Sequence, residues 1–155
     1  MPKPVITRES PMGPDLALLM QRHSIDMWAE TPPESVHMMD ASQLAIPEVA
    51  FYVLREDGQA LAMGAFKQLT DGHGEIKSMH VLAEHRGRGL SGLMVQHLVT
   101  EARAGGLVRL SLETGSQPIF APARRLYERA GFTECDPFEG YHADPNSVFM
   151  TRALE

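Results

Sequence analysis

Short apolar runs separated by turn residues fill the middle of the chain, a pattern typical of β-strands. Two such runs, 49–55 and 60–66, flank Asp57 and Gly58, and an Asp-Gly pair in that position is a strong hairpin signal. A third run, 75–81, follows the glycine-bearing turn at 70–74. Together these runs predict three consecutive antiparallel strands.

Apolar residues at helical spacing follow the three strands and define the clearest helix of the sequence. The apolar residues are Leu90, Leu93, Met94, Leu98 and Ala102, His97 lies on the same stripe, and two glycines at 105 and 106 end the run. Other helices are predicted over 15–28 and 122–130, and other strands over 5–8, 108–113 and 148–150. The meander is thus followed by a β-α-β crossover, a helix and closing strands. The proline-broken connection 30–47 is long, and connections of that length are often functional.

Composition narrows the class of protein. The chain has 155 residues, 43% of them hydrophobic, which suits one domain with a single sizeable core. Its 14 Lys and Arg against 20 Asp and Glu give a net charge of -6, which argues against a nucleic-acid partner. Neither a membrane-spanning run nor the apolar stretch of a signal peptide is present, so we expect a soluble cytoplasmic protein without a membrane partner.

Metal and disulfide chemistry is not expected. The single cysteine, Cys135, cannot form an internal disulfide and has no CxxC partner. The sequence also lacks an H-x-x-x-H pair or a carboxylate cluster. We therefore expect no metal cofactor, and the apolar core must supply the stability.

The glycine-bearing segment 86–92 is the most informative part of the sequence. Its glycines let the backbone approach a ligand closely, and it opens directly onto the predicted helix, whose N-terminus carries free N–H groups and a positive dipole end. His85, Arg86 and Arg88 add positive charge at the same place. An anion such as a pyrophosphate fits here; the alternative is a solvated turn that merely enters a helix.

The same segment satisfies the dinucleotide pattern G-x-G-x-x-G with Gly87, Gly89 and Gly92, and Glu113 follows at about the expected distance. An NAD(P)-dependent oxidoreductase is therefore one alternative. Against it, residues 82–86 separate the glycines from the preceding strand, and an antiparallel meander comes first.

The residues also resemble a known family, the GNAT-type N-acetyltransferases. Arg86-x-x-Gly89-x-Ser91 is similar to the family signature Q/R-x-x-G-x-G/A, although Ser91 is larger than the usual Gly or Ala. Leu126-Tyr-Glu-Arg-Ala-Gly-Phe132 resembles the family's LYxxxGF segment. The resemblance covers about residues 49–153, and other segments look like a small bacterial subgroup with poorly defined substrates.

The resemblance implies a single domain over 1–155, with acceptor-side elements in about 1–48 and an acetyl-coenzyme A-binding core in about 49–155. It implies a mixed α/β fold, with a mostly antiparallel twisted sheet of six to seven strands and about four helices. The implied cosubstrate is acetyl-CoA, contacted by Met79, His80, Val81, Arg86, Gly87, Arg88, Gly89, Leu90, Ser91, Gly92, Ala123 and Tyr127. Many family members are dimers, so a homodimer is a further expectation.

The implied activity is transfer of an acetyl group to the primary amine of a small molecule or protein. Direct attack by the amine is preferred because the sequence shows no activated nucleophile. Glu75 is the candidate general base and Tyr127 the candidate general acid, while Glu113 is a second base or an amine-binding carboxylate. Each also has a purely structural alternative: Glu75 could be a salt-bridged strand carboxylate, Tyr127 a packed aromatic ring and Glu113 a cap for the following turn. Strict alternation along the strand would put His80 on the face opposite Glu75.

The acceptor-binding candidates lie mostly in the proline-broken connection and before it. They are Trp28, Glu34, His37 and Glu113, which could recognise a polar or cationic amine. Besides the oxidoreductase, a second alternative to an acetyltransferase is a non-catalytic domain that binds or senses an acyl-coenzyme A.

Overall fold

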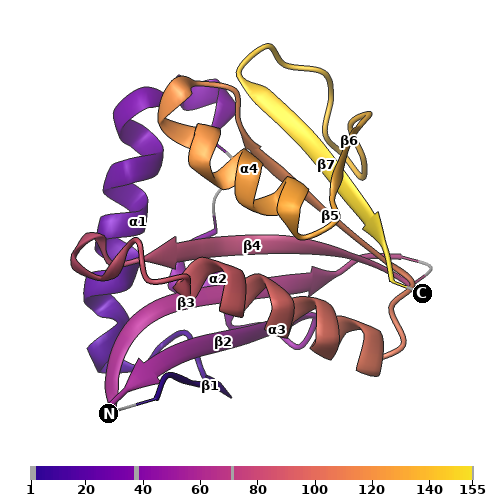
Figure 1. The fold of residues 1–155 in the computed structure, drawn as a ribbon. Coiled ribbons are helices and arrows are strands. Elements are labelled where there is room, and N and C mark those ends of the chain that lie inside the picture. Colours follow the sequence, from indigo (N-terminus) through magenta and orange to yellow (C-terminus); the bar gives the residue numbers. More distant parts are fainter. Residues whose placement is uncertain (1–2, 37–38, 71, 155) are drawn as a thin grey trace.

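The computed structural model describes residues 3–36, 39–70 and 72–154, and within these ranges the chain forms a seven-stranded sheet of order β1-β2-β3-β4-β5-β7-β6 (Figure 1). The strands are β1 (Val5–Arg8), β2 (Val49–Glu56), β3 (Gln59–Gln68), β4 (His73–Val81), β5 (Arg109–Gly115), β6 (Thr133–Cys135) and β7 (Ser147–Ala153). Neighbours are antiparallel except β4 and β5, which are parallel. The expected mixed fold with a mostly antiparallel sheet is confirmed.

Helices cover both faces of the sheet. They are α1 (Ala17–Glu30), α2 (Ala41–Leu44), α3 (Leu90–Ala104) and α4 (Ala121–Arg129). Figure 1 shows α3 and α4 over one face, where Met94, Leu98 and Tyr127 join the larger core cluster. The smaller cluster lies under α1 and α2 and contains Leu19 and Leu44. Among the described residues, helices long and apolar enough to cross a membrane are absent.

Burial on both faces explains why β2 reads as one apolar run. Phe51 and Val53 belong to the cluster under α1 and α2, whereas Tyr52 and Leu54 belong to the cluster under α3 and α4. A strand covered on both sides has no polar face, so its sequence does not alternate.

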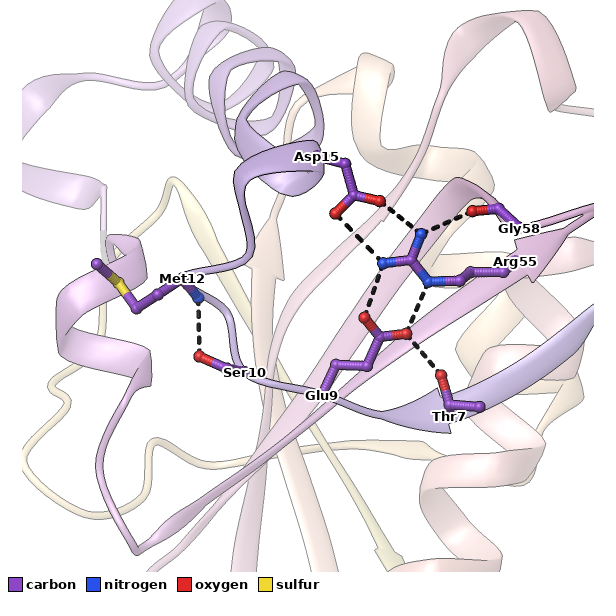
Figure 2. A network of polar contacts seen from close by, with 7 residues as sticks. All are labelled: Thr7, Glu9, Ser10, Met12, Asp15, Arg55 and Gly58. Atoms are coloured by element: carbon purple, nitrogen blue, oxygen red, sulfur yellow. Dashed lines mark hydrogen bonds and ion pairs between the residues drawn. The ribbon is translucent and has the colours of Figure 1, made fainter.

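An ion-pair network holds the start of the chain in place (Figure 2). Arg55 on β2 donates to both carboxylate oxygens of Glu9, at 2.8 and 2.7 Å, and to Asp15 at 2.6 Å. The planar guanidinium suits this forked geometry. The contacts fix the segment between β1 and α1, and therefore the position from which α1 begins.

A β-bulge interrupts β4 at Ser78. Met63 of β3 pairs with His80 and Ala65 pairs with Lys77, so two residues of β4 face Gly64 alone. Ser78 has a φ of 58°, in the left-handed region that a serine rarely adopts. A side chain at Gly64 would meet Met94 Cγ at 2.7 Å and Met79 Sδ at 2.8 Å, so the close approach of these methionines requires glycine.

The bulge shows that the alternation expected for β4 is wrong past Lys77. Glu75 pairs with Lys67 and His80 with Met63, and positions 63 and 67 of β3 face the same side. His80 therefore shares a face with Glu75. Met79 and Val81 instead pack on the α3 side of the sheet. The extra residue at the bulge shifts the register by one, which the sequence pattern alone does not reveal.

Candidate active site

The parallel strands β4 and β5 separate soon after they meet. Their described residues pair only at His73 with Arg109, Gly74 with Leu110 and Glu75 with Ser111. Beyond these pairs β4 and β5 diverge, and α4 lies above β4 in the view of Figure 1. Met79, His80 and Val81 lie on the part of β4 past the last of these pairs. The backbone of this edge is thus placed to pair with an extended ligand.

The segment 86–92 forms the predicted glycine turn into α3. Gly87 and Gly89 have φ values of 82° and 78°, which glycine adopts without strain. Gly89 caps α3, and none of the described side chains caps its N-terminus. By helix geometry the N–H groups of Leu90, Ser91 and Gly92 lack intrahelical partners, and they stand at the positive end of a 15-residue helix. This end of α3 fits an anion.

The side chains of this segment differ in role. Leu90 is buried in the core, so its side chain anchors the helix, while the Leu90 backbone belongs to the turn. Ser91 is half-buried. Arg88 is ion-paired with Glu56, and its Nη1 lies 3.1 Å from Nδ1 of His85. Arg86 and Arg88 thus stand beside the turn, each ion-paired with a carboxylate, Asp26 and Glu56 respectively.

Glu75 is the centre of a buried polar network. Tyr141 donates a hydrogen bond of 2.6 Å to its Oε2, and Lys77 Nζ lies 3.1 Å from the same oxygen. Lys77 also donates to the Tyr141 hydroxyl at 2.8 Å. Burial and the neighbouring Glu75 charge raise the pKa of Tyr141 well above its usual range, so the hydroxyl keeps its proton. Sequence reasoning identified Glu75 but neither Lys77 nor Tyr141.

Glu113 on β5 has an unusual environment for a carboxyl. Burial raises its pKa to about 7, with smaller contributions from the charges of Glu75 and Asp144 in the same direction. The Ser147 hydroxyl and the Lys77 ammonium oppose this shift only in part. Glu113 therefore changes its charge near neutral pH.

An open pocket of about 400 Å³ lies beside Glu75. Its lining residues are Met39, Lys67, Leu69, Glu75, Lys77, Glu139, Gly140, Tyr141, His142 and Asp144. The segment 136–146, which connects β6 to β7, forms one wall. Glu139 accepts a 2.8 Å hydrogen bond from Thr70, and Asp144 accepts one from Ser35, so contacts at both ends hold this segment over the sheet.

The candidate acceptor residues are not brought together. Trp28 is 51% exposed on α1, and Glu34 is exposed in the 3-10 turn Pro33–Ser35. Neither lines the pocket beside Glu75. His37 lies outside the described residues. The residues that do meet are Glu75, Lys77 and Tyr141. The charges of Glu75 and Lys77 also act on the pKa of Glu113.

Tyr127 lies on α4 in the larger core cluster, 6% exposed, with its ring centroid 5.9 Å from that of Phe132. Burial raises its pKa above the usual range, so it stays protonated at neutral pH. Ala123 is half-buried on the same helix. Among the described side chains, groups of three or more His, Cys, Asp or Glu able to hold a metal ion are absent.

Comparison with known proteins gives a consistent result. The profile of the acetyltransferase (GNAT) family matches residues 19–132. A Bacillus subtilis protein named uncharacterized N-acetyltransferase YsnE is 44% identical over 142 residues, 92% of this chain and 94% of the relative. An Azospirillum brasilense protein named IAA acetyltransferase is 36% identical over 99% of this chain and all of the relative (100%).

Solved structures share the fold. A Klebsiella pneumoniae protein provisionally assigned as an acyl-CoA N-acyltransferase superposes with a TM-score of 0.82 at 31% identity, over 98% of both chains. An aminoglycoside 6'-N-acetyltransferase complexed with coenzyme A superposes with a TM-score of 0.72 at 13% identity, over 97% of both chains.

Proposed function

The chain belongs to the acetyltransferase (GNAT) family, and from this premise we propose that it transfers the acetyl group of acetyl-CoA to a primary amine. The cosubstrate supplies an acetyl group activated as a thioester. Over the whole reaction a C–N bond forms and a C–S bond breaks, while one proton leaves the amine and one reaches the sulfur. The protein must therefore hold an anionic coenzyme, accept one proton and return one.

One observation carries the proposal: past Glu75, where its described pairs with β5 end, β4 leads directly to the N-terminus of α3, which no described side chain caps. The amides of residues 87–92 fit a pyrophosphate, because free N–H groups and the helix dipole point to the same place. The edge of β4 at residues 79–81 fits an amide-bearing arm, because it has lost its β5 partner.

Glu113 is the carboxylate that we assign as general base. A base works best when its pKa lies near the operating pH, and burial raises the pKa of Glu113 to about 7. Glu75, in contrast, already accepts a hydrogen bond from Tyr141 and pairs with Lys77. We assign Glu75 to binding and orienting the acceptor amine in the pocket that it lines.

Tyr127 remains the proposed acid that returns a proton to the departing sulfur. Its burial keeps the hydroxyl protonated at neutral pH, which a proton donor requires.

The charges beside the pocket support a cationic acceptor of small size. Glu75, Glu139 and Asp144 line it together with Lys67 and Lys77, and Glu113 adds negative charge from β5. A small amine in its protonated form is attracted by this excess of carboxylates. It releases its extra proton to solvent before the attack, so that the neutral amine then loses the one proton counted above.

Thiol release from acetyl-CoA in the presence of a panel of amines tests the proposal. We expect acceptor-dependent release, and a loss of about a hundredfold in kcat for Glu113→Gln, the range typical of a lost general base. Glu134→Gln on the exposed part of β6 is the matched control and should leave the rate unchanged. Coenzyme binding without release by any amine would favour a sensing domain, and binding of reduced nicotinamide instead would favour an oxidoreductase.

A further inference from the structure

Helix α1 is fastened to the chain segment that leads from β4 into the glycine turn. Three consecutive contacts make this connection: Arg22 with Glu84, His23 with His80 and Asp26 with Arg86. Arg22 and Asp26 are four residues apart and His23 and Asp26 three, so these side chains leave α1 on the same side, toward this segment. The anchoring therefore links the acceptor side of the molecule to the proposed coenzyme site.

Arg86 is the most tightly held of the residues on this segment. Its Nε donates to the carbonyl oxygen of Val81 at 3.0 Å, and its Nη2 donates to Oδ2 of Asp26 at 3.1 Å. The first contact closes the bend between the end of β4 and the glycine turn. The second fixes the direction of the guanidinium by tying it to α1. A planar guanidinium held at two of its N–H groups has little freedom to rotate.

His80 does not compete with Arg86 for the charge of Asp26. Its Nδ1 lies 3.9 Å from Asp26 Oδ2, beyond hydrogen-bond distance. Burial lowers the pKa of His80 to about 4; the Asp26 charge opposes this shift, and the Arg86 and Arg22 charges add to it. The imidazole is therefore neutral at neutral pH, and Arg86 is the cationic partner of Asp26.

We propose that Asp26 is a positioning residue of the coenzyme site, acting through Arg86 on the bend that presents the amides of residues 87–92. This inference rests on the proposed function, because it concerns the site assigned to acetyl-CoA. Asp26 itself need not contact the coenzyme: when Arg86 is released from Asp26, the Val81 to Arg86 bend loosens and the amides lose their common direction. Acceptor chemistry at Glu113 on β5 stays intact.

The test compares coenzyme affinity with turnover in Asp26→Asn. The Asp26 side chain is 47% exposed, so the amide is compatible with folding. We expect the Kd for coenzyme A and the KM for acetyl-CoA to rise about fivefold, as for the weakening of one charge-assisted hydrogen bond, with kcat changed less than twofold. Asp26→Glu, which keeps the charge, should recover at least half of the lost affinity on a logarithmic scale.

A double-mutant cycle decides whether Asp26 acts through Arg86. Arg86→Gln should weaken coenzyme binding by itself, and Asp26→Asn added to it should cause no further loss. Arg22→Gln is the matched control, since it breaks the adjacent exposed α1 contact and should alter Kd less than twofold. Unchanged affinity in Asp26→Asn, or losses that multiply in the double variant, would overturn this inference alone. A wild-type chain that does not bind coenzyme A would overturn the proposed function and this inference with it.

Discussion

The hydroxyl of Tyr141 donates a 2.6 Å hydrogen bond to Oε2 of Glu75, although 66 residues separate the two in the sequence. The bond joins the segment 136–146 to the middle of β4, and Lys77 contacts both groups. A buried carboxylate is stable only when such partners replace water. The pocket wall and the candidate acceptor-binding carboxylate are therefore fixed by the same contact.

Tyr141→Phe should impair the acceptor side of the site and spare the coenzyme side. The variant keeps the ring but leaves Glu75 with one partner fewer, so its orientation in the pocket loosens. We expect kcat/KM for the amine to fall about tenfold and the free energy of unfolding to fall by about 1–3 kcal/mol, the cost of an unsatisfied buried acceptor. Steady-state kinetics and urea denaturation measure these changes.

Tyr52→Phe provides the control for this variant, because Tyr52 packs on the α3 side of the sheet, away from the pocket. It should leave kcat/KM for the amine unchanged. An equal rise in the Kd for coenzyme A in Tyr141→Phe would contradict the separation of the two sides.

The pH dependence of the reaction should report Glu113. Its carboxyl must be deprotonated to accept a proton, and burial raises its pKa to about 7. We therefore expect kcat/KM to increase with pH below about 7 and to level off above it. In Glu113→Gln the residual kcat/KM should no longer rise with pH below about 7, whereas this acidic limb of the profile should persist in Glu75→Gln. Persistence of the limb in Glu113→Gln would assign it to another group.

Local signals made the helices and the hairpin predictable from sequence. The apolar stripe from Leu90 to Ala102 and the Asp57-Gly58 turn lie where α3 and the β2–β3 hairpin are found. A signal for α2 was also present, since Asp40 and Gln43 form a capping box, but the surrounding prolines obscured it. The edge strand β6 has only three residues, Thr133–Cys135, too few for a period to show.

The site depends on contacts that no local pattern encodes. The bulge at Ser78 accompanies the packing of Met79 and Met94 against Gly64, which are brought together only in the folded sheet. The choice between Glu75 and Glu113 as base rests on burial and on Tyr141, a residue from a distant segment. Sequence resemblance could indicate residues 86–92 as a candidate coenzyme turn because that motif is contiguous, whereas the pocket joins Glu75 to the distant segment 136–146.

Gly64→Ala should show that the bulge shapes the coenzyme site. The added methyl would lie 2.7 Å from Met94 Cγ and 2.8 Å from Met79 Sδ, so the methionines or β4 must shift. We expect a loss of about 1–3 kcal/mol in the free energy of unfolding, as for overpacking elsewhere, together with a several-fold higher KM for acetyl-CoA. Gly105→Ala, whose methyl would meet only ordinary contacts at 3.4 Å or more, is the control. A destabilised Gly64→Ala with an unchanged KM would mean that the bulge serves packing alone.

The two histidines between α1 and β4 should make the protein sensitive to acid. His23 and His80 are buried with ring centroids 5.4 Å apart, and burial lowers the pKa of each to about 4. The unfolded chain takes up these protons near pH 6.5, whereas the folded chain does so only near pH 4. Acidification therefore favours the unfolded state: this part of the stability is fully present above pH 6.5 and is lost as the pH falls toward 4.

Urea denaturation from pH 7.5 to 4.5 measures this effect as the difference between wild type and His80→Asn. Glu113 contributes with the opposite sign, since its raised pKa favours the folded state as the pH falls from about 7 toward 4.5, but that contribution is common to both proteins and cancels. We expect the wild type to lose roughly 2 kcal/mol relative to the variant across this range. His142→Asn, which alters an exposed imidazole, should follow the wild type. Parallel curves for wild type and His80→Asn would show that His80 takes up its proton equally in the folded and unfolded chains.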